Sequence, residues 1–189
     1  MSATPDSGAN GAPQNPPGAG PLAGVKVLEL GTLIAGPFAA RFLGEFGADV
    51  IKIEDPKGGD PLRKWRKLYP EVGGTSLWWA VQARNKKSVT INLKAEEGKE
   101  IVRRLAREAD IVVENFRPGL LEKLGLGYDV LSAENPGLVM VRLSGYGPEC
   151  VKTHFWSATI LHPIAGDERD EAVRSRRQSY SELSPPRST

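Results

Sequence analysis

Short apolar, β-branched runs that alternate with longer amphipathic segments constrain the fold of this 189-residue chain more than any other feature. The predicted strands are Val25–Leu30, Asp49–Glu54, Ser88–Leu93, Ile111–Val113 and Leu138–Leu143. The segments between and after them have helical spacing, and the predicted helices are Phe38–Phe46, Thr75–Asn85, Lys94–Ala109, Leu120–Leu124 and Val130–Glu134. Strands and helices that alternate at this spacing form right-handed β-α-β units. The sequence therefore predicts an α/β fold with a Rossmann-like, open and mostly parallel sheet and flanking helices.

Composition divides the chain into three parts. Residues 1–20 are rich in Pro, Gly, Ala and Ser and lack aliphatic periodicity, so we expect a disordered N-terminal tail. Residues 21–147 carry the alternating pattern and form the predicted domain. After residue 147 the pattern stops, and residues 167–189 consist mainly of charged residues and serine. We expect residues 148–189 to be an irregular or disordered tail, which leaves an incomplete domain with disordered termini.

Composition also restricts the class of protein. Cys150 is the only cysteine, so no internal disulfide can form, and no Cys/His spacing of a metal site occurs. No window is long and apolar enough for a membrane span. The first residues lack the apolar core of a secretion signal and the arginines of a mitochondrial presequence, which favours the cytoplasm. A net charge of +2 is too small to indicate nucleic acid.

A cluster of polar side chains follows the predicted strand Ile111–Val113, where the sequence reads ENFRPG from Glu114 to Gly119. Ligands of open α/β sheets bind at the carboxyl ends of the strands, so this is a candidate ligand site. The alternative is that Asn115 only caps the turn that follows. The turn at residues 31–37, after the first strand, has two glycines but not the spacing GxGxxG, and is only a weak indication of phosphate binding.

Basic residues are concentrated after the second predicted strand and before the third. They are Lys57, Arg63, Lys64, Arg66, Lys67, Arg84, Lys86 and Lys87. A charged run of this kind is often only a solvated surface. Its predicted place, at the same edge of the sheet as Asn115 and Arg117, favours a polyphosphate ligand. Nucleic acid is disfavoured because the charge is local and is not interleaved with stacking aromatic residues.

Consecutive motifs from about Pro21 to Gly147 resemble the N-terminal part of the family III coenzyme A transferases, the CaiB/BaiF type. The motifs are PLAGVKVLELGTLIAGPFAARFLGEFGADVIKIE, GGDPLRKW, RNKKSVTINLK, EEGKEIVRRLAREADIVVENFRPG and LEKLGLGYDVLSAENPGLVMVRLSGYG. The resemblance implies an enzyme that moves CoA from an acyl-CoA to a free carboxylic acid, such as a dicarboxylate, without a metal. It also implies interlocked homodimers, although this chain is too short to supply the segments that close each ring.

The resemblance further implies which residues bind CoA, which in the family lies over the strand ends. Asn115, Arg117 and Lys123 match positions along the CoA pocket. Ile91 matches a position near the adenine, and Leu33 and Ile34 match positions by the thioester. Weaker candidates from the same face are Arg63, Asn85 and Lys86. A polar residue occupies the position of Ile34 in some formyl-CoA-type members, so Ile34 argues against that substrate.

Two other functions stay open at this stage. The α-methylacyl-CoA racemases share the resemblance but abstract an α-proton with a His/Asp pair. They tend to read EGFRPG and TGWG, whereas Asn115 and Tyr146 of this chain match the transferase forms ENFRPG and SGYG. The third possibility is a non-catalytic module that binds CoA, a nucleotide or a protein partner through an open sheet edge.

The resemblance ends before the aspartate with which family III transferases attack the thioester, a step of covalent catalysis by a carboxylate. Asp167 and Asp170 are the next carboxylates, but they lie in a charged run without the family's flanking pattern, and we interpret them as solvated. His154 and His162 lack a partner at a recognisable spacing. We therefore assign no catalytic residue and hypothesise a truncated product, for instance of a frameshift near Pro148, that lacks the chemistry.

Overall fold

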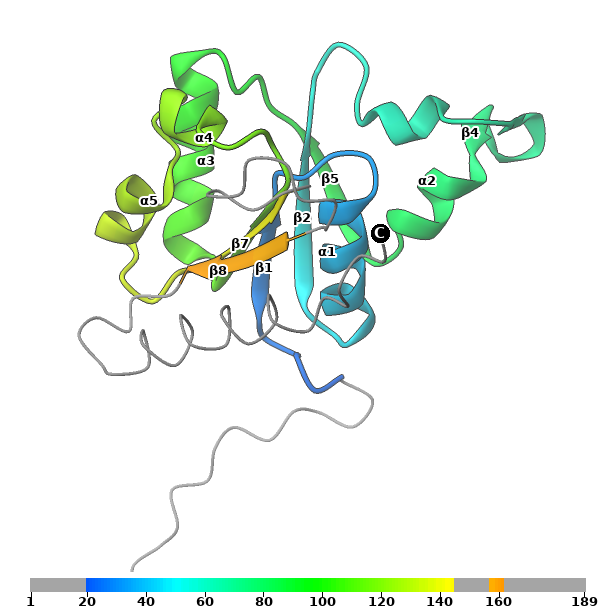
Figure 1. The fold of residues 1–189 in the computed structure, drawn as a ribbon. Coiled ribbons are helices and arrows are strands. Elements are labelled where there is room, and N and C mark those ends of the chain that lie inside the picture. Colours follow the sequence, from blue (N-terminus) through cyan, green and yellow to red (C-terminus); the bar gives the residue numbers. More distant parts are fainter. Residues whose placement is uncertain (1–19, 145–156, 162–189) are drawn as a thin grey trace, which may run out of the picture.

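The computed structural model describes residues 20–144 and 157–161, whose strands form one six-stranded and one two-stranded sheet (Figure 1). The strands are β1 (Lys26–Glu29), β2 (Asp49–Glu54), β3 (Leu68–Tyr69), β4 (Thr75–Ser76), β5 (Lys86–Thr90), β6 (Ile111–Glu114), β7 (Val139–Ser144) and β8 (Ser157–Leu161). The α-helices are α1 (Ala35–Glu45), α2 (Leu77–Gln82), α3 (Glu96–Glu108), α4 (Leu120–Lys123) and α5 (Tyr128–Glu134). Two short 3-10 helices are η1 (Pro61–Lys64) and η2 (Pro70–Val72).

The large sheet has the strand order β5-β2-β1-β6-β7-β8, and its first five strands are parallel. Only β8 runs antiparallel, beside β7. This arrangement confirms the predicted α/β fold with a mostly parallel sheet. Because the five parallel strands end at the same edge, residues that follow them are brought together there. We call the side of the sheet at which the parallel strands end the carboxyl edge, and the side at which they begin the amino edge; neither name refers to the outer strands β5 and β8.

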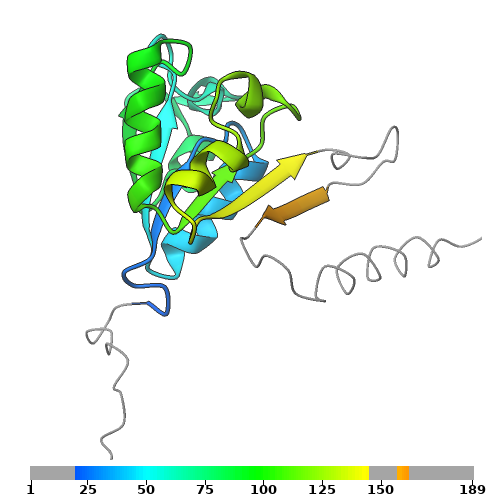
Figure 2. The ribbon, with the colours of Figure 1, turned by 90° about the vertical axis from the view of Figure 1, so that its left-hand side faces the viewer.

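Helices cover both faces of the large sheet (Figures 1 and 2). On one face, Ala40 of α1 packs in a cluster with Val27 and its neighbours on the strands. On the other face, Val102 of α3 shares a larger cluster with Leu28 and Val112, which residues of α4 and α5 join. Apolar side chains that alternate along β1 thus enter two separate cores. This explains why the strands read as continuous apolar runs in the sequence.

The predicted helix Thr75–Asn85 is shorter in the structure, where β4 precedes α2. Ser76 has an extended backbone, and its hydroxyl accepts a hydrogen bond from the backbone N–H of Trp78 at 3.1 Å. This is an N-cap, which fixes the start of α2 one residue later. At the other end, Asn85 has a φ of +57°, which a helix cannot continue through. The cap at Ser76 therefore sets the start of α2, and the helix ends at Gln82, before Asn85.

Five residues of the predicted irregular tail form a strand, β8, whose backbone pairs with β7 from Met140 to Ser144. The sequence SATIL contains two β-branched residues, which suit a strand. These residues lie in the predicted tail, because the alternating sequence pattern stops at residue 147. The predicted tail at residues 1–20 lies, except for Gly20, outside the described residues, as do Cys150, His154, His162, Asp167 and Asp170.

We predict that Gly98→Ala destabilises the fold, because Gly98 brings the first turn of α3 against the loop after β5. A Cβ atom at Gly98 would lie 2.1 Å from the carbonyl oxygen of Asn92, a backbone atom that cannot swing away. We expect the free energy of unfolding to fall by at least about 2 kcal/mol, as for overpacked cores. Urea denaturation followed by circular dichroism measures this difference.

The matched control is Gly58→Ala, since nothing lies within 4 Å of a Cβ atom at Gly58 and this glycine is exposed. Its stability should be unchanged or raised by no more than about 1 kcal/mol, through the loss of unfolded-state entropy. Equal stability of the two variants would contradict the close approach of α3 to residue 92.

Candidate functional site

The loop between β1 and α1, residues 30–34, crosses the carboxyl edge in a very tight turn. A Cβ atom at Gly31 would lie 2.8 Å from the Cα atom of Gly36, and one at Gly36 would meet Gly31 equally closely. The two glycines are thus required by a backbone crossing. This is the structural reason for the paired glycines noted in the sequence. We call residues 30–34 the β1–α1 loop.

Asn115, directly after β6, holds the centre of this loop. Its Oδ1 atom accepts a hydrogen bond from the backbone N–H of Thr32 at 2.7 Å, and its Nδ2 atom donates to the carbonyl oxygen of Thr32 at 2.8 Å. The side-chain amide therefore binds the loop as a neighbouring strand would. The structure places Asn115 at the predicted edge but uses its amide to fix the protein backbone.

A buried lysine, Lys52 on the neighbouring strand β2, also binds this loop. Its side chain is 1% exposed, and its Nζ atom lies 2.8 Å from Glu29 Oε1 and 2.8 Å from Asp60 Oδ2. It also donates a hydrogen bond to the carbonyl oxygen of Gly31 at 2.7 Å. A buried charge is tolerated only when it is paired and hydrogen-bonded, and Lys52 meets both conditions.

Lys86 extends this group of charges to α1. Its Nζ atom lies 2.7 Å from Glu29 Oε2 and donates to the carbonyl oxygen of Pro37 at 2.7 Å. Burial lowers the pKa of Lys86, and the charge of Glu29 opposes this effect. Two lysines and two carboxylates thus balance one another in the interior. We predicted Lys86 as a ligand-binding cation, but the structure directs its ammonium group into this buried cluster, which we call the ionic cluster (Glu29, Lys52, Asp60 and Lys86).

Arg63 on η1 is also paired within the protein. Its guanidinium makes two hydrogen bonds to Glu54, Nε to Oε2 at 2.7 Å and Nη2 to Oε1 at 2.8 Å, and lies 3.8 Å from the ring centre of Trp79. This bidentate pairing raises the pKa of Arg63. Glu54 also accepts a hydrogen bond from the backbone N–H of Asp60 at 2.8 Å. The predicted cation Arg63 therefore supports the ionic cluster from its outer side.

Opposing effects determine the pKa of Glu54. Burial alone would raise it, but hydrogen bonds from Arg63, from the hydroxyl of Ser88 and from the backbone of Asp60 outweigh burial and lower the pKa from 4.5 to about 2. Glu54 is therefore ionised throughout the neutral range.

Arg117 and Lys123 behave differently from Arg63 and Lys86. Both side chains are exposed, and neither charged group has a hydrogen bond or ion pair within residues 20–144 and 157–161. Both lie in the segment that follows β6, Arg117 before α4 and Lys123 at its end. These two residues are free to meet an anion from solvent at the carboxyl edge.

Leu33 and Ile34 lie in the β1–α1 loop and are each 40% exposed. Leu33 has a φ of +62°, in the left-handed region that leucine rarely adopts. Its backbone N–H donates to both carboxylate oxygens of Asp60, at 3.1 and 3.3 Å. The loop thus keeps two large apolar side chains open to solvent at the predicted edge.

Ile91 and Asn85 lie at opposite edges of the sheet. Ile91 follows β5 at the carboxyl edge but is only 6% exposed and belongs to the core on the α3 face, so its side chain is used in packing. Asn85 directly precedes β5 and therefore lies at the amino edge, where its carbonyl oxygen approaches Gly44 near the end of α1. Asn85 therefore does not share the edge of Asn115, because the residue before a parallel strand and the residue after one lie at opposite edges; a contact of Ile91 with the adenine stays a prediction.

Sequence reasoning missed Glu29, Lys52 and Asp60 as parts of the site. The available signal was the charged residue inside each apolar run, Glu29 in VKVLEL and Lys52 in DVIKIE. A lysine or glutamate inside a buried strand needs a partner of opposite charge, and the parallel register places Glu29 opposite Lys52. The pairing follows only once β1 and β2 are known to be neighbours.

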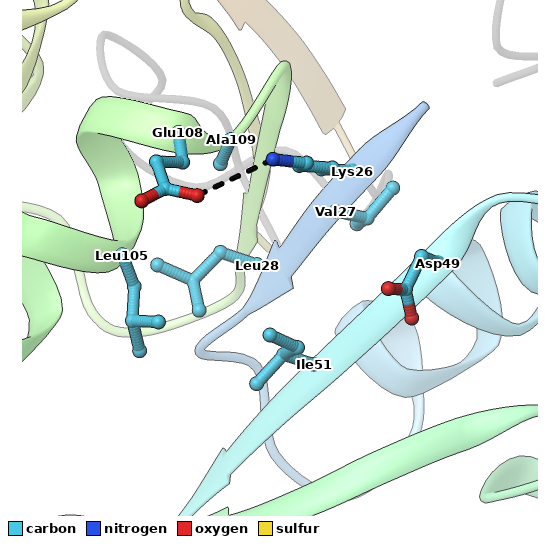
Figure 3. A pocket seen from close by; sticks show the side chains of 8 residues that line it. All are labelled: Lys26, Val27, Leu28, Asp49, Ile51, Leu105, Glu108 and Ala109. Atoms are coloured by element: carbon cyan, nitrogen blue, oxygen red, sulfur yellow. Dashed lines mark hydrogen bonds and ion pairs between the residues drawn. The ribbon is translucent and has the colours of Figure 1, made fainter. Parts of the chain in front are cut away.

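A cavity of about 220 Å³ lies away from the candidate site, at the amino edge between β1, β2 and the end of α3 (Figure 3). Its apolar floor includes Leu28 and Leu105, and an ion pair of 3.3 Å between Lys26 and Glu108 lies at its rim. None of the predicted ligand-binding residues lines it.

Two further features are absent from the part of the chain that the structure describes. There, no group of three His, Cys, Asp or Glu side chains is arranged to hold a metal ion. No helix among these residues is long and apolar enough to cross a membrane.

Comparison with known proteins gives a consistent result. The model of CoA-transferase family III matches residues 22–159. A succinyl-CoA–D-citramalate CoA-transferase of Chloroflexus aurantiacus is 55% identical over 135 residues, which cover 71% of this chain and 32% of the relative. The human succinyl-CoA:glutarate CoA-transferase is 43% identical over 127 residues, covering 67% and 28%. The crystal structure of a CaiB/BaiF family protein from Brucella suis superimposes with a TM-score of 0.62 at 43% identity, covering 68% of this chain and 34% of that one.

This chain therefore spans about a third of the length of the curated relatives it matches. That share agrees with the prediction that it carries only part of the family's fold. The family match continues to residue 159, beyond the predicted domain end at residue 147, and thus includes the first residues of β8.

We predict that Glu54→Gln destabilises the protein in a pH-dependent way. A carboxyl group whose pKa is about 2 when folded and 4.5 otherwise stabilises the folded state above pH 4.5. This contribution is about 3 kcal/mol at pH 7 and is lost as the pH falls from 4.5 towards 2. Urea denaturation at a series of pH values should show the wild-type and Glu54→Gln curves converging in acid.

Glu108→Gln is the control, because Glu108 is an exposed carboxylate whose side chain is 77% accessible. Surface ion pairs of this kind contribute at most about 1 kcal/mol. A pH-independent difference between wild type and Glu54→Gln would show that the Arg63 pair does not hold Glu54 in its ionised form.

Proposed function

Because the chain belongs to CoA-transferase family III, we propose that it binds CoA at the carboxyl edge of its sheet and takes part in transferring CoA from an acyl-CoA to a dicarboxylic acid. The family fixes the class of reaction, and the edge where five parallel strands end is the position at which such sheets bind ligands. The activity of the whole protein belongs to this proposal, since the chain spans about a third of its relatives.

The substrate class is supported by the relatives. The bacterial relative is named for succinyl-CoA and D-citramalate, and the human relative for succinyl-CoA and glutarate. Citramalate, glutarate and the acid released from succinyl-CoA all carry two carboxylates. We therefore propose succinyl-CoA as the donor class and a dicarboxylate as the acceptor.

One observation carries the proposed CoA site. Arg117 and Lys123 are cations without a partner in the described residues, whereas Arg63 and Lys86 are already neutralised by buried carboxylates. An unpaired guanidinium and ammonium beside a strand end suit the phosphates of CoA. Leu33 and Ile34 offer apolar surface at the same edge for an uncharged part of the ligand. Asn115 serves this site by holding the β1–α1 loop.

The chemical step needs a nucleophile that is not among the residues of the proposed CoA site. The carboxylates Glu29, Glu54 and Asp60 are each buried and paired with a lysine or arginine, which makes them poor nucleophiles. The aspartate that the family resemblance implies has no counterpart that we can assign in the described residues. The proposed role of this chain is therefore CoA binding, with the nucleophile supplied by another segment.

The family resemblance also implies a partner subunit. Two relatives from Chloroflexus aurantiacus are named as the alpha and beta subunits of a succinyl-CoA–L-malate CoA-transferase. We propose that this chain, too, works in an assembly with another family subunit.

We predict that Arg117→Ala weakens CoA binding about tenfold, because one charge-assisted contact to phosphate contributes about 1.4 kcal/mol. Lys123→Ala should weaken it about threefold to tenfold, since an ammonium contacts phosphate at a single point. Isothermal titration of CoA into the purified chain measures both dissociation constants.

Arg104→Ala is the matched control, because Arg104 on α3 is likewise exposed and has no ion pair among the described residues. It should change the dissociation constant less than twofold. If all three variants lose the same affinity, CoA responds only to net charge and the proposed site is wrong.

A further inference from the structure

We propose that Asn115 and Asp60 are positioning residues, which lock the β1–α1 loop into its ligand-binding conformation before CoA arrives. This inference rests on the proposed function, and it assigns these two residues to holding the site and not to contacting the ligand.

The hydrogen bonds reach consecutive peptide groups of the loop. Lys52 donates to the carbonyl oxygen of Gly31, Asn115 binds both the N–H and the carbonyl oxygen of Thr32, and Asp60 accepts from the N–H of Leu33. These partners come from β2, from the segment after β6 and from the start of η1. Three separate parts of the fold therefore converge on three successive loop residues.

Asp60 is suited to this role because it is only 2% exposed and is fixed on several sides. Its carboxylate forms an ion pair with Lys52 at 2.8 Å and accepts from the N–H of Leu62 at 2.8 Å, while its own N–H donates to Glu54. A carboxylate held in this way cannot follow Leu33 if the loop moves. The N–H of Leu33 is therefore held in place by the ionic cluster.

The backbone of Leu33 is strained within this fixed loop. Leucine at a φ of +62° is strained, and strained residues persist where the surrounding structure over-determines them. Burial of side chains does not explain the strain, because Leu33 and Ile34 are each 40% exposed. In this loop, internal hydrogen bonds offset the backbone strain of Leu33 and keep apolar side chains exposed. Such a loop is preorganised for a ligand at the carboxyl edge.

A purely structural role for Asn115 can be separated from a positioning role by comparison with Asn135. The side-chain amide of Asn135 is also half-buried, and it donates to the carbonyl oxygens of Ala106 and Ala109 at 3.0 and 2.8 Å. It lies after α5 and does not contact the β1–α1 loop. Asn115→Ala and Asn135→Ala therefore remove similar hydrogen bonds between an asparagine side chain and the backbone, at different places in the fold.

The first measurement is amide hydrogen exchange by NMR on the purified chain, without CoA. In Asn115→Ala, the amide of Thr32 should exchange at least about tenfold faster than in wild type, because an exposed amide without an acceptor loses its protection. The amide of Val50 in β2 should be unchanged, and Asn135→Ala should leave Thr32 protected. Unchanged exchange of Thr32 in Asn115→Ala would overturn the proposal.

Asp60→Asn is the second variant, since it keeps the shape of the side chain and removes its charge. It should accelerate exchange of the Leu33 amide, and, if the loop is held as one unit, that of Thr32 as well. If only Leu33 responds, the two residues act separately and the proposed joint hold is wrong.

The second measurement is the CoA dissociation constant of the same variants. We expect Asn115→Ala and Asp60→Asn to weaken binding about tenfold, and Asn135→Ala less than twofold. Wild-type affinity in the two loop variants, with exchange accelerated, would overturn the positioning role and leave the CoA site intact. If the unsubstituted chain binds no CoA, the proposed function fails and the ligand-related part of this inference fails with it, whereas the exchange data still decide whether the loop is held.

Discussion

The ion pairs of Lys52 with Glu29 and Asp60 are the interaction on which the rest of this structure depends. They join two neighbouring strands to the loop after β2. Lys52 has a side chain that is only 1% exposed, and carboxylates at 2.8 Å neutralise its buried charge. Because Lys52 also binds the backbone of Gly31, the position of the first loop at the carboxyl edge is coupled to the pairing of β1 with β2. An isolated buried ammonium would be very unfavourable, so the β1–β2 pairing and the position of the loop depend on the same neutralised lysine.

Pairing with buried carboxylates also distinguishes cations that stabilise the fold from cations that can bind a ligand. Arg63 and Lys86 lie in a basic part of the sequence, yet both are committed to carboxylates, Arg63 in a bidentate pair with Glu54 and Lys86 with Glu29. Arg117 and Lys123 have no such partner in the described residues, which is why the proposed phosphate contacts fall to them.

Much of the fold could be predicted from the sequence because it depends on local periodicity. The apolar runs and amphipathic segments gave the strands, the helices and the edge at which Asn115 and Arg117 lie. The partners of Glu29 and Lys52 could not be predicted, because they depend on which strands are neighbours and on their register. Ile91 and Asn85 were expected in the site from the family resemblance; in the structure Ile91 packs in the core and Asn85 precedes its strand.

The central claim is that CoA binds at the carboxyl edge, against a β1–α1 loop held in place by the protein's own charges. Backbone chemical-shift mapping by NMR during a CoA titration tests it most directly. The account predicts that the shifted amides cluster at residues 31–36 and 115–123, on neighbouring strand ends. Shifts that cluster instead around Lys26, Leu105 and Glu108, at the cavity of the amino edge, would contradict it.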